Sequence, residues 1–462
     1  MPLTERLHQH FPFSPTAEQE ALFRKLADFM APTSRAKPCF LLKGYAGTGK
    51  TVVLQALTKS LRQQRKKVLL LAPTGRAAKI LSKNSGQEAY TIHSQLYKPV
   101  QHPYSGQMDM QLRKNYHRNT LVIVDEASML SGEGGKSDGG LLADLTNWVY
   151  SQPGNALLLV GDPAQLPPVG ERTSLALEED VLRWAYGLDL ETHSLSEVSR
   201  QQQGSGILAN ATYLRQCLEE LPQQLQLTTS GYRDVFQLPE ERLMEGLRWA
   251  YQHEGAGNTL FLCATNEEAA KTNALIRSAI LGYRQEVVAG DLLMIARNNY
   301  QALPKNSKLS YLANGEFAEV THVMGEEQRF GFRFLRLKLR LPDEPALAPF
   351  ESFVLMETLD SRHPSLPEER SRSLFEGASR QYRYMARSKQ VRSLRKDPYL
   401  NALQVKFAYA LTCHKAQGGQ WKTVLLQPRF WVREPNTPDK LRWFYTAITR
   451  ASDTLYLLNA RL

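Results

Sequence analysis

Short apolar runs alternate with amphipathic stretches along the first third of the chain. The runs PCFLLKG, KKVLLLAPT, TLVIVDEAS and NALLLVGDP are each bounded by turn residues or charges, which is typical of buried parallel strands. Between the first two lies a helix-like segment, Thr51–Gln63. Strands that alternate with helices in this way predict an α/β fold, with a parallel sheet covered by helices on both faces.

A second set of apolar runs follows later in the chain. TLFLCATN, KTVLLQP and TLYLLNA have the same character, so we expect a second α/β core. Two segments interrupt the pattern. Residues 98–118 show no helical period, and residues 291–402 contain alternating stretches, FAEVTHV and RFLRLKLRL, which predict short antiparallel strands.

The charge balance points to the kind of partner. The 462 residues carry 57 Lys and Arg against 46 Asp and Glu, a formal net charge of +11. This excess favours nucleic acid as a partner, with a generally basic protein as the alternative. The four cysteines lie far apart without a CxxC pair, so we expect no disulfides or zinc and a cytoplasmic location. Neither a secretory signal nor a membrane span, which needs about 18 apolar residues, is expected.

The stretch KGYAGTGKTVV contains a phosphate-binding loop pattern between a predicted strand and a predicted helix. Its glycines let backbone N–H groups approach phosphates, Lys50 neutralises the β and γ oxygens, and the Thr51 hydroxyl can ligate Mg²⁺. ATP and Mg²⁺ are therefore the expected cofactors. We expect the nucleotide at Gly44, Ala46, Gly47, Thr48, Gly49, Lys50 and Thr51.

Two further strand ends carry groups suited to hydrolysis. In VIVDEAS, Asp125 is placed to hold Mg²⁺ and Glu126 to accept a proton from the attacking water. In GDPAQLPPVG, the Gln165 amide is suited to bond both the γ-phosphate and that water. Alone, each motif is as consistent with a solvated or Pro-stiffened turn.

Other residues suit contacts across the nucleotide. Arg200 in LSEVSRQ and Arg450 in YTAITRAS are candidates for stabilising charge on the transferring phosphoryl group, although a lone Arg is usually a surface charge. Gln19 lies upstream of the loop, where an amide is suited to read the adenine edge.

The stretch AYALTCHKAQGGQWKTVLL mixes hydroxyl, imidazole, ammonium and amide groups ahead of a strand. Thr412, His414 and Lys415 suit phosphate contacts on a strand of nucleic acid. Gly418 suits a close approach to the nucleotide. A solvated loop is the alternative for this piece taken alone.

Taken together, the ordered motifs GYAGTGKT, VIVDEASM, GDPAQLPPVG, SEVSRQ, LTCHKAQGGQW and FYTAITRA resemble those of superfamily 1 helicases of the RecD/Dda-type branch. The resemblance covers most of the chain. It implies two RecA-like cores with parallel sheets, a small pin inserted in the first core and an SH3-like β-barrel inserted in the second. The implied divisions are 1–193 for the first core, with the pin at about 94–118, then 194–290 and 403–462 for the second core, and 291–402 for the barrel.

The resemblance also implies residue roles. Gln19 is similar to the adenine-reading glutamine of the family, and Arg200 and Arg450 to its two arginine fingers. Two first-core stretches, APTGRAA and TIHSQL, resemble strand-tracking motifs, and CATN resembles their counterpart in the second core. The implied DNA contacts in these three stretches are Pro73, Thr74, Arg76, Thr91, His93, Thr265 and Asn266. Segment 342–402 does not match the family pattern, which leaves its docking site open.

Two predictions concern DNA outside the motor motifs. Pro103 and Tyr104 form a candidate wedge at the tip of the pin, where Tyr104 would stack on the first base pair; a plain loop is the alternative. In the basic tract 380–396, a continuous helix would place Arg380, Arg383 and Arg387 on one face. We expect Arg383 and Arg387 to contact DNA, with a solvated helix or a clamp on acidic loops as the alternative.

These observations predict an ATP-dependent DNA helicase that moves on single-stranded DNA and unwinds duplexes. The 5′→3′ direction comes from the resemblance only. Two alternatives stay open: an RNA helicase, and an ATP-switched DNA-binding subunit of a recombination or repair complex. The expected partners are single-stranded DNA, its junctions with duplex, and other repair or replication proteins.

Overall fold

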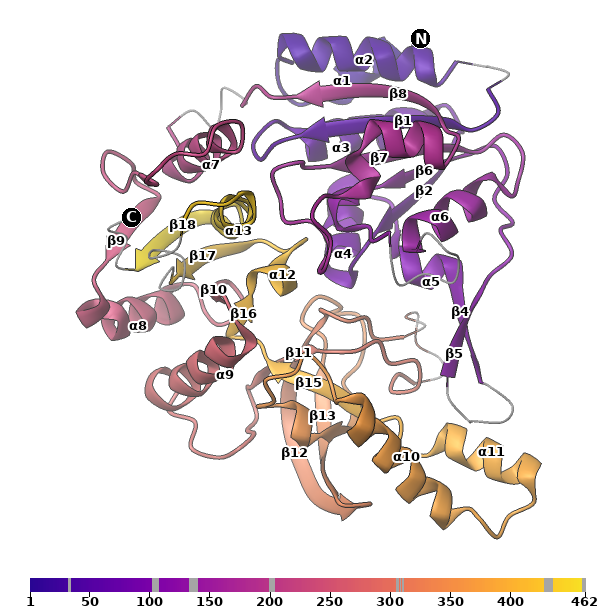
Figure 1. Cartoon of the computed structure of the whole chain (residues 1–462), viewed down its shortest axis with the longest axis vertical. Coiled ribbons are helices and arrows are strands. Elements are labelled where there is room, and N and C mark those ends of the chain that lie inside the picture. The colour runs from indigo at the N-terminus through magenta and orange to yellow at the C-terminus, as the bar shows by residue number, and fades with distance from the viewer. Residues whose placement is uncertain are drawn as a thin grey trace.

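The structure, a computed structural model, describes residues 1–31, 35–101, 108–132, 140–198, 204–304, 307, 309, 311–427 and 435–458. It contains two parallel sheets, a closed barrel and a separate two-stranded hairpin. Figure 1 shows the first sheet at the top, the second at the left and the barrel below both. No helix in the described ranges is long and apolar enough to cross a membrane.

The first sheet has six parallel strands in the order β3-β2-β6-β7-β1-β8. Alternate residues of the central strands face opposite sides, because side chains alternate along a strand. Phe40 and Leu42 pack with α1 to α4, whereas Cys39 and Leu41 pack with α5 and α6. The strands are β1 (Pro38–Gly44), β2 (Lys67–Ala72), β3 (Ala89–Thr91), β6 (Thr120–Val124), β7 (Ala156–Gly161) and β8 (Asp189–Leu195), and the helices are α1 (Leu3–His10), α2 (Ala17–Phe29), α3 (Lys50–Gln63), α4 (Gly75–Ser85), α5 (Ile92–Leu96) and α6 (Gly140–Tyr150).

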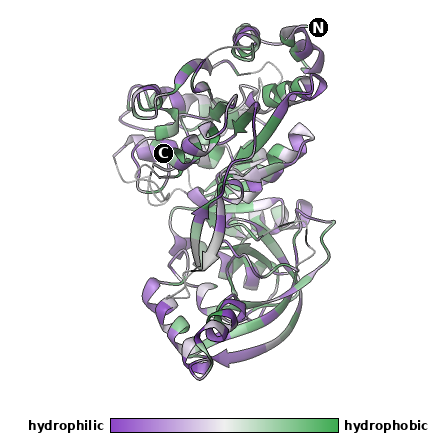
Figure 2. Cartoon of the chain, turned by 90° about the vertical axis from the view of Figure 1, so that its right-hand side faces the viewer, coloured by the Kyte–Doolittle hydropathy of each residue, from purple (hydrophilic) through white to green (hydrophobic). Residues whose placement is uncertain are grey.

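The second sheet has five parallel strands in the order β16-β10-β17-β18-β9. The prediction of parallel-sheet α/β architecture from the apolar runs is therefore confirmed for both sheets. Figure 2 shows the hydrophobic residues gathered in these sheets. The elements are β9 (Val235–Leu238), β10 (Thr259–Cys263), β16 (Ala410–Thr412), β17 (Trp421–Leu426), β18 (Ala451–Leu458), α7 (Gly206–Cys217), α8 (Leu243–His253), α9 (Asn266–Leu275), α12 (Cys413–Ala416) and α13 (Pro438–Ile448).

A closed five-stranded barrel lies between β10 and β16 in the chain. Its strands are β11 (Leu292–Ile295), β12 (Phe317–Arg329), β13 (Phe332–Arg340), β14 (Phe350–Leu355) and β15 (Leu403–Phe407), and only the β14–β15 pair is parallel.

Two predicted boundaries need correction. Strand β15 was assigned to the second core, but it pairs with β11 on one edge and β14 on the other and so closes the barrel. Strand β8 pairs with β1 as far as Leu195, two residues beyond the predicted end of the first core.

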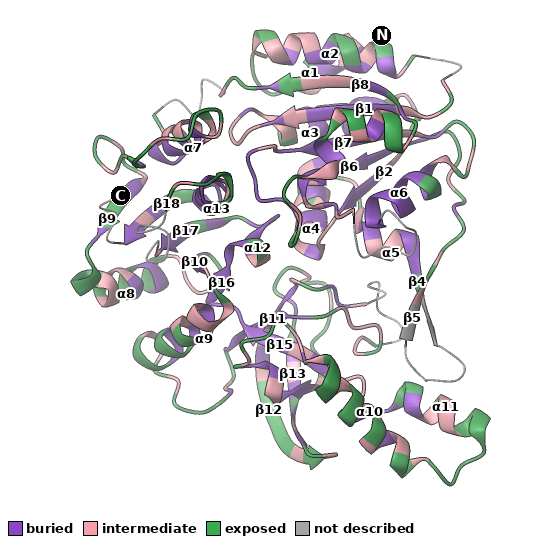
Figure 3. Ribbon diagram, in the orientation of Figure 1, coloured by how far each residue is buried: buried purple, intermediate pink, exposed green. Residues whose placement is uncertain are grey.

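A helical hairpin stands between β14 and β15, in the segment that the family pattern did not explain. It consists of α10 (Glu368–Gln381) and α11 (Arg387–Lys396). Leu374 of α10 packs against Phe332 and Phe334 of the barrel, which identifies the docking partner that the sequence left open. The outer faces of this α10–α11 hairpin are largely exposed (Figure 3).

The expectation of one helical face through the basic tract is wrong. Helix α10 ends at Gln381 and α11 begins at Arg387, so Arg380, Arg383 and Arg387 do not share a helix. Between the helices, the Tyr382 hydroxyl donates a 2.9 Å hydrogen bond to Asp397, which holds the two helices in the hairpin.

Residues 97–112 include an antiparallel pair, β4 (Tyr97–Gln101) and β5 (Met108–Leu112), which projects from the first core in Figure 1. Its base is fixed because the buried Tyr97 hydroxyl donates a 2.6 Å hydrogen bond to Asp144 of α6. The candidate wedge at Pro103 and Tyr104 lies outside the described residues, so the role of this hairpin as a pin remains a prediction.

Candidate nucleotide site and nucleic-acid groove

The phosphate-binding loop joins β1 to α3, as predicted. Gly47 and Gly49 adopt left-handed backbone conformations with φ of 78° and 86°. A Cβ at position 49 would also lie only 2.7 Å from the Gln19 amide nitrogen, so only glycine fits there. Lys50 folds over the loop, and its Nζ donates hydrogen bonds to the Gly44 and Tyr45 carbonyls at 2.6 and 2.8 Å.

Asp125 and Glu126 follow the last residue of β6. The Asp125 Oδ1 accepts a 2.9 Å hydrogen bond from the Glu126 amide, and Glu126 itself has a left-handed φ of 53°. Burial and then the neighbouring Glu126 charge raise the pKa of Asp125 to about 7, against the opposing effects of the Glu126 amide and Lys50. Carboxylates with such a shifted pKa are enriched at functional sites.

The donor set fits Mg²⁺. Asp125 supplies a carboxylate, and the Thr51 hydroxyl lies exposed at the start of α3. In the described part of the chain, no three His, Cys, Asp or Glu side chains gather as a metal cluster. Mg²⁺ is commonly held by one or two protein oxygens together with substrate phosphates rather than by a protein cage.

Asp162, which the sequence interpretation passed over, is central to the site. It directly follows β7, is 1% exposed, and lies 3.8 Å from the Lys50 Nζ through its Oδ2. The signal was available, because β6 and β7 are parallel neighbours whose carboxyl ends meet at one edge of the sheet. Asp162 therefore lies beside the predicted catalytic carboxylates.

The second core reaches this site through Tyr445 of α13. The Tyr445 hydroxyl donates a 2.8 Å hydrogen bond to the Asp162 Oδ2 and accepts a 2.7 Å hydrogen bond from the Ala46 amide. Tyr445 is 1% exposed, and burial, followed by the Asp162 charge, raises its pKa well above the usual value. One buried hydroxyl thus joins the second core to both the phosphate loop and the end of β7.

The loop after β7 is also hydrogen-bonded to the second core. The Leu166 amide donates to the Thr446 hydroxyl at 2.9 Å, and the Leu166 carbonyl accepts from the Gln417 amide at 2.8 Å. The adjacent Gln165 is buried, and its Oε1 has no hydrogen-bond partner among the described residues. Buried polar atoms are normally paired, so this oxygen is a candidate for contact with a ligand.

Of the two predicted arginine fingers, one is engaged within its own core and the other lies outside the described residues. Arg450 is 4% exposed and bonds within its own core, to the Thr446 and Gly419 carbonyls and the Thr449 hydroxyl at 3.0, 3.1 and 3.2 Å. Its role as an arginine finger therefore remains a prediction that requires these bonds to break. Arg200 lies outside the described residues.

Gln19 supports the phosphate loop in this structure. Its amide oxygen accepts from the Thr16 backbone and its amide nitrogen donates to the Thr48 carbonyl, both at 3.0 Å. Adenine reading by Gln19 remains a prediction. Gly418 differs from expectation, since its close approach is to α4: a Cβ there would lie 2.9 Å from the Ala77 Cβ.

A large groove of about 1380 Å³ runs between the cores, the barrel and the α10–α11 hairpin. Both α/β cores contribute residues to its lining that the resemblance implied as DNA contacts. The predicted residues that it brings together are Pro73, Thr74, Thr91, His93, His414 and Lys415.

The far wall of the groove was not predicted. It carries three exposed arginines, Arg297, Arg372 and Arg395, and the groove lining as a whole includes one carboxylate, Glu368. These residues come from the loop after β11 and from the two helices of the α10–α11 hairpin. Among the described lining residues, Arg383 and Arg387 do not occur, so their predicted DNA contact is not supported by this geometry.

A pair of tyrosines also lines the groove. Tyr300 and Tyr311 stack with ring centroids 5.1 Å apart and planes inclined by 20°, and the Tyr311 hydroxyl bonds to Thr91 of the first core. Their sequence context, a polar loop between two strands, gave no periodic signal that could have singled them out.

Arg76 and Thr265 have structural partners. The Arg76 guanidinium lies 4.7 Å from the Phe317 ring and 3.9 Å from the Trp421 ring, which join the first core to the barrel and to the second core. Burial, the largest cause, lowers the pKa of Arg76 to about 10. Thr265 caps α9 by accepting a 3.1 Å bond from the Glu268 amide. Neither observation supports the predicted DNA contacts.

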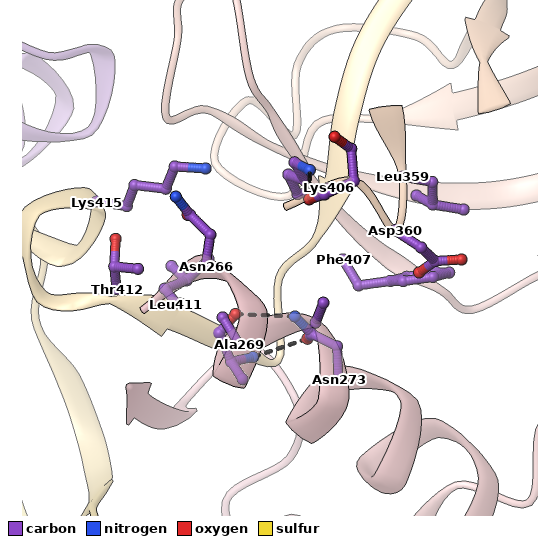
Figure 4. A pocket seen from close by; sticks show the side chains of 13 residues that line it. Asn266, Ala269, Asn273, Leu359, Asp360, Lys406, Phe407, Leu411, Thr412 and Lys415 are labelled. Carbon is purple, nitrogen blue, oxygen red and sulfur yellow. Dashed lines mark hydrogen bonds between the residues drawn. The ribbon is translucent and has the colours of Figure 1, made fainter. Parts of the chain in front are cut away.

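Asn266, Thr412 and Lys415 meet at a small cavity of about 20 Å³ (Figure 4). Two charged residues that the sequence interpretation did not single out, Lys406 of β15 and Asp360, also line it. Lys415 lines both this cavity and the large groove.

Comparison with known proteins covers both cores. The AAA domain family matches residues 16–227, and the UvrD-like helicase C-terminal domain matches residues 407–458. The ATP-dependent RecD2 DNA helicase of Deinococcus radiodurans is 36% identical over 132 residues, which are 28% of this chain and 16% of that protein. The ATP-dependent DNA helicase dda of Enterobacteria phage T4 is 34% identical over 137 residues, 29% of each chain.

The solved structure of a Pif1 helicase from Bacteroides in complex with ADP-AlF3 and ssDNA aligns with 97% of this chain and 93% of that chain, at 17% identity and a TM-score of 0.49. The chain spans less than a third of the length of the RecD2 and dda helicases that it matches. The two domain families and these two relatives confirm the similarity to superfamily 1 helicases of the RecD/Dda branch.

Proposed function

We propose that this chain is an ATP-driven motor that moves along single-stranded DNA and unwinds duplexes, in the 5′→3′ direction. The observation that carries the proposal is the position of the groove. Residues of both cores line it, and the same two cores meet at the phosphate loop through Tyr445. A nucleotide at the phosphate loop and a DNA strand in the groove would therefore both contact the interface between the two cores.

The chain's own groups suit ATP hydrolysis. Lys50 lies beside the loop to neutralise the β and γ oxygens, and Glu126 follows β6 in a position to accept a proton from water. Thr51 and Asp125 would hold Mg²⁺, which supplies charge neutralisation between the phosphates when bound. Gln165 would bond the γ-phosphate through its unpartnered oxygen.

Movement follows from the contacts between the cores. Closure of the cleft around ATP brings the strand-motif residues of the two cores together, and release of phosphate separates them. Because each core holds the strand through its own residues, one cycle of closing and opening moves the groove along the strand. The closed and open arrangements of the two cores are two states of the chain, and contacts with the γ-phosphate favour the closed one.

The charge and aromatic content of the groove favour a single strand of nucleic acid. Its lining carries Arg297, Arg372, Arg395 and Lys415 against one carboxylate, which complements a phosphate backbone. The stacked tyrosines offer a surface on which bases of any sequence can stack.

The test is unwinding of duplexes that bear either a 5′ or a 3′ single-stranded tail, made in DNA and in RNA. We expect ATP-dependent opening of 5′-tailed DNA and no opening by the Lys50→Ala variant. Opening of only 3′-tailed duplexes would reverse the direction, and equal opening of RNA would favour the RNA helicase. Strand binding without opening of any duplex would favour the ATP-switched subunit.

A further inference from the structure

The cavity shown in Figure 4 lies where the barrel joins the second core. Asn266 comes from the start of α9, Thr412 from β16, Lys415 from α12 and Lys406 from the barrel strand β15. Lys415, Thr412 and Asn266 lie on one side of the cavity in this view, with Lys406 and Asp360 on the other. The floor is held rigid, since Asn273 of α9 bonds both the amide and the carbonyl of Ala410 at 2.8 and 2.9 Å.

The size of the cavity restricts what can enter. A volume of about 20 Å³ exceeds the roughly 10–15 Å³ that one water-sized group requires, and is far too small for a base or a sugar. Lys415 also lines the large groove, so a strand in that groove lies next to the cavity. One oxygen atom of a larger ligand in the groove is the group that fits.

The two lysines of the cavity face one carboxylate, Asp360, so the positive charge there is only partly balanced. Lys406 is 7% exposed, and its Nζ donates to the Ser361 carbonyl, a neutral group. Among the described residues, no carboxylate forms an ion pair with either Lys406 or Lys415. Burial, and then the Lys415 charge, lower the pKa of Lys406 to about 8, while Asp360 opposes this shift. A buried ammonium group, Lys406, that faces the same small space as the partly buried Lys415 is stabilised by an anion.

We infer that this cavity receives one non-bridging oxygen of a backbone phosphate, and that Lys406 is a nucleic-acid contact supplied by the barrel. This inference rests on the proposed function, because the strand that carries the phosphate is the one in the groove. Lys415, Thr412 and Asn266 hold the phosphate from the second core, and Lys406 holds it from the barrel. The contact ties the strand to both units, so the barrel moves with the second core.

The experiment compares Lys406→Met with Lys422→Met. Lys422 lies on β17 of the second core, where it pairs with Glu254, and it does not line the groove, so the control removes one positive charge away from the groove. Single-stranded DNA affinity is measured over a series of salt concentrations. We expect Lys406→Met to weaken binding about tenfold and to flatten the log–log salt slope by about 0.7, with the slope of Lys422→Met unchanged.

A second measurement locates the phosphate. Oligonucleotides that carry one neutral methylphosphonate linkage are scanned along the strand. For the wild-type chain, a methylphosphonate at one position should weaken binding strongly. The same linkage at that position should have no such effect on binding by Lys406→Met. Lys406→Arg, which keeps the charge, should retain part of the positional effect.

The outcomes separate this inference from the proposed function. If the wild-type chain does not bind or respond to single-stranded DNA, the proposed function fails. If it binds with a normal salt slope but Lys406→Met behaves like Lys422→Met, the cavity holds only water and the inference fails alone. ATP hydrolysis without DNA should be the same in all three variants, which excludes a folding defect.

Discussion

The nucleotide cleft and the nucleic-acid groove lie between the same two cores but are built differently. In the cleft, short hydrogen bonds between buried groups fix the geometry, as Tyr445 with Asp162 and Gln417 with Leu166 show. In the groove, exposed arginines and a tyrosine stack line an open channel. Chemistry on a phosphate needs fixed positions, whereas a strand of any sequence needs charge and flat surfaces that tolerate its variation.

The largest expected effect lies in the cleft. Glu126→Gln keeps the shape of the side chain but removes its ability to accept a proton, so ATP should still bind while turnover falls by about 10²–10⁴-fold. Single-turnover hydrolysis, with nucleotide binding measured separately, checks this. Near-normal hydrolysis in Glu126→Gln would remove Glu126 from the role of general base.

The next effect tests the groove against the rest of the α10–α11 hairpin. Arg372 and Arg395 line the groove, although Arg372 also pairs with Glu368 at 3.7 Å, whereas Arg383 and Arg387 do not line it. Changing the first pair to Ala should flatten the salt slope of DNA binding by about 1.4, at about 0.7 per lost phosphate contact. The second pair changed to Ala removes the same charge and serves as the matched control. A flattened slope in the control instead would place the DNA on the outer side of the hairpin.

A smaller effect is expected from the link between the cores. Tyr445→Phe removes the hydroxyl, so Asp162 and the Ala46 amide each lose a hydrogen bond. This loss should lower the free energy of unfolding by about 1–3 kcal/mol. Chemical denaturation measures the change. Tyr456→Phe, a partly buried tyrosine in the second sheet that stacks on Phe236, is the control. Equal stability of both variants would show that the Tyr445 contact does not hold the cores together.

The smallest effect is a pH dependence at the small cavity. Lys406, with a pKa lowered to about 8, faces Lys415 from α12 and Asp360 from the loop after η7 (Met356–Thr358), while α9 contributes only amides. Phosphate binding requires the ammonium form, so DNA affinity should fall as pH rises through about 8, and less so in Lys406→Met.

The free energy of unfolding should rise with pH at this residue, whereas DNA affinity should fall. Between about pH 8 and the unperturbed lysine pKa of about 10.4, the unfolded chain binds more protons at Lys406 than the folded chain. The free energy of unfolding contributed by this residue therefore rises with pH across that window. Denaturation of Lys406→Met at both ends of the window should lack this rise.

The apolar runs predicted the two sheets well because parallel strands buried on both faces leave continuous hydrophobic signals. The phosphate loop was also predictable, since its glycines and Lys50 are adjacent in sequence and their spacing follows from the ligand. Strand β15 was misassigned because its pairing partners, β11 and β14, are decided by barrel closure rather than by local pattern.

Residues whose role depends on packing were harder to predict. Arg76 occurs in a strand-motif stretch, yet two aromatic rings from distant segments surround it. Arg383 and Arg387 looked like parts of one helix, but α10 ends before Arg383 and the Tyr382–Asp397 bond joins the two helices of a hairpin. Asp162 and Tyr445 are far apart in sequence, so their contact had no local signal.

Coupling between the cleft and the groove is the central claim, and the rate of ATP hydrolysis with and without single-stranded DNA tests it most directly. A strand that engages Thr91 of the first core and Lys415 of the second should change how the cores meet at Lys50 and Tyr445. We predict that saturating single-stranded DNA raises the hydrolysis rate of the wild-type chain and leaves Lys50→Ala inactive. The same rate with and without DNA, in a chain shown to bind both ligands, would contradict the account.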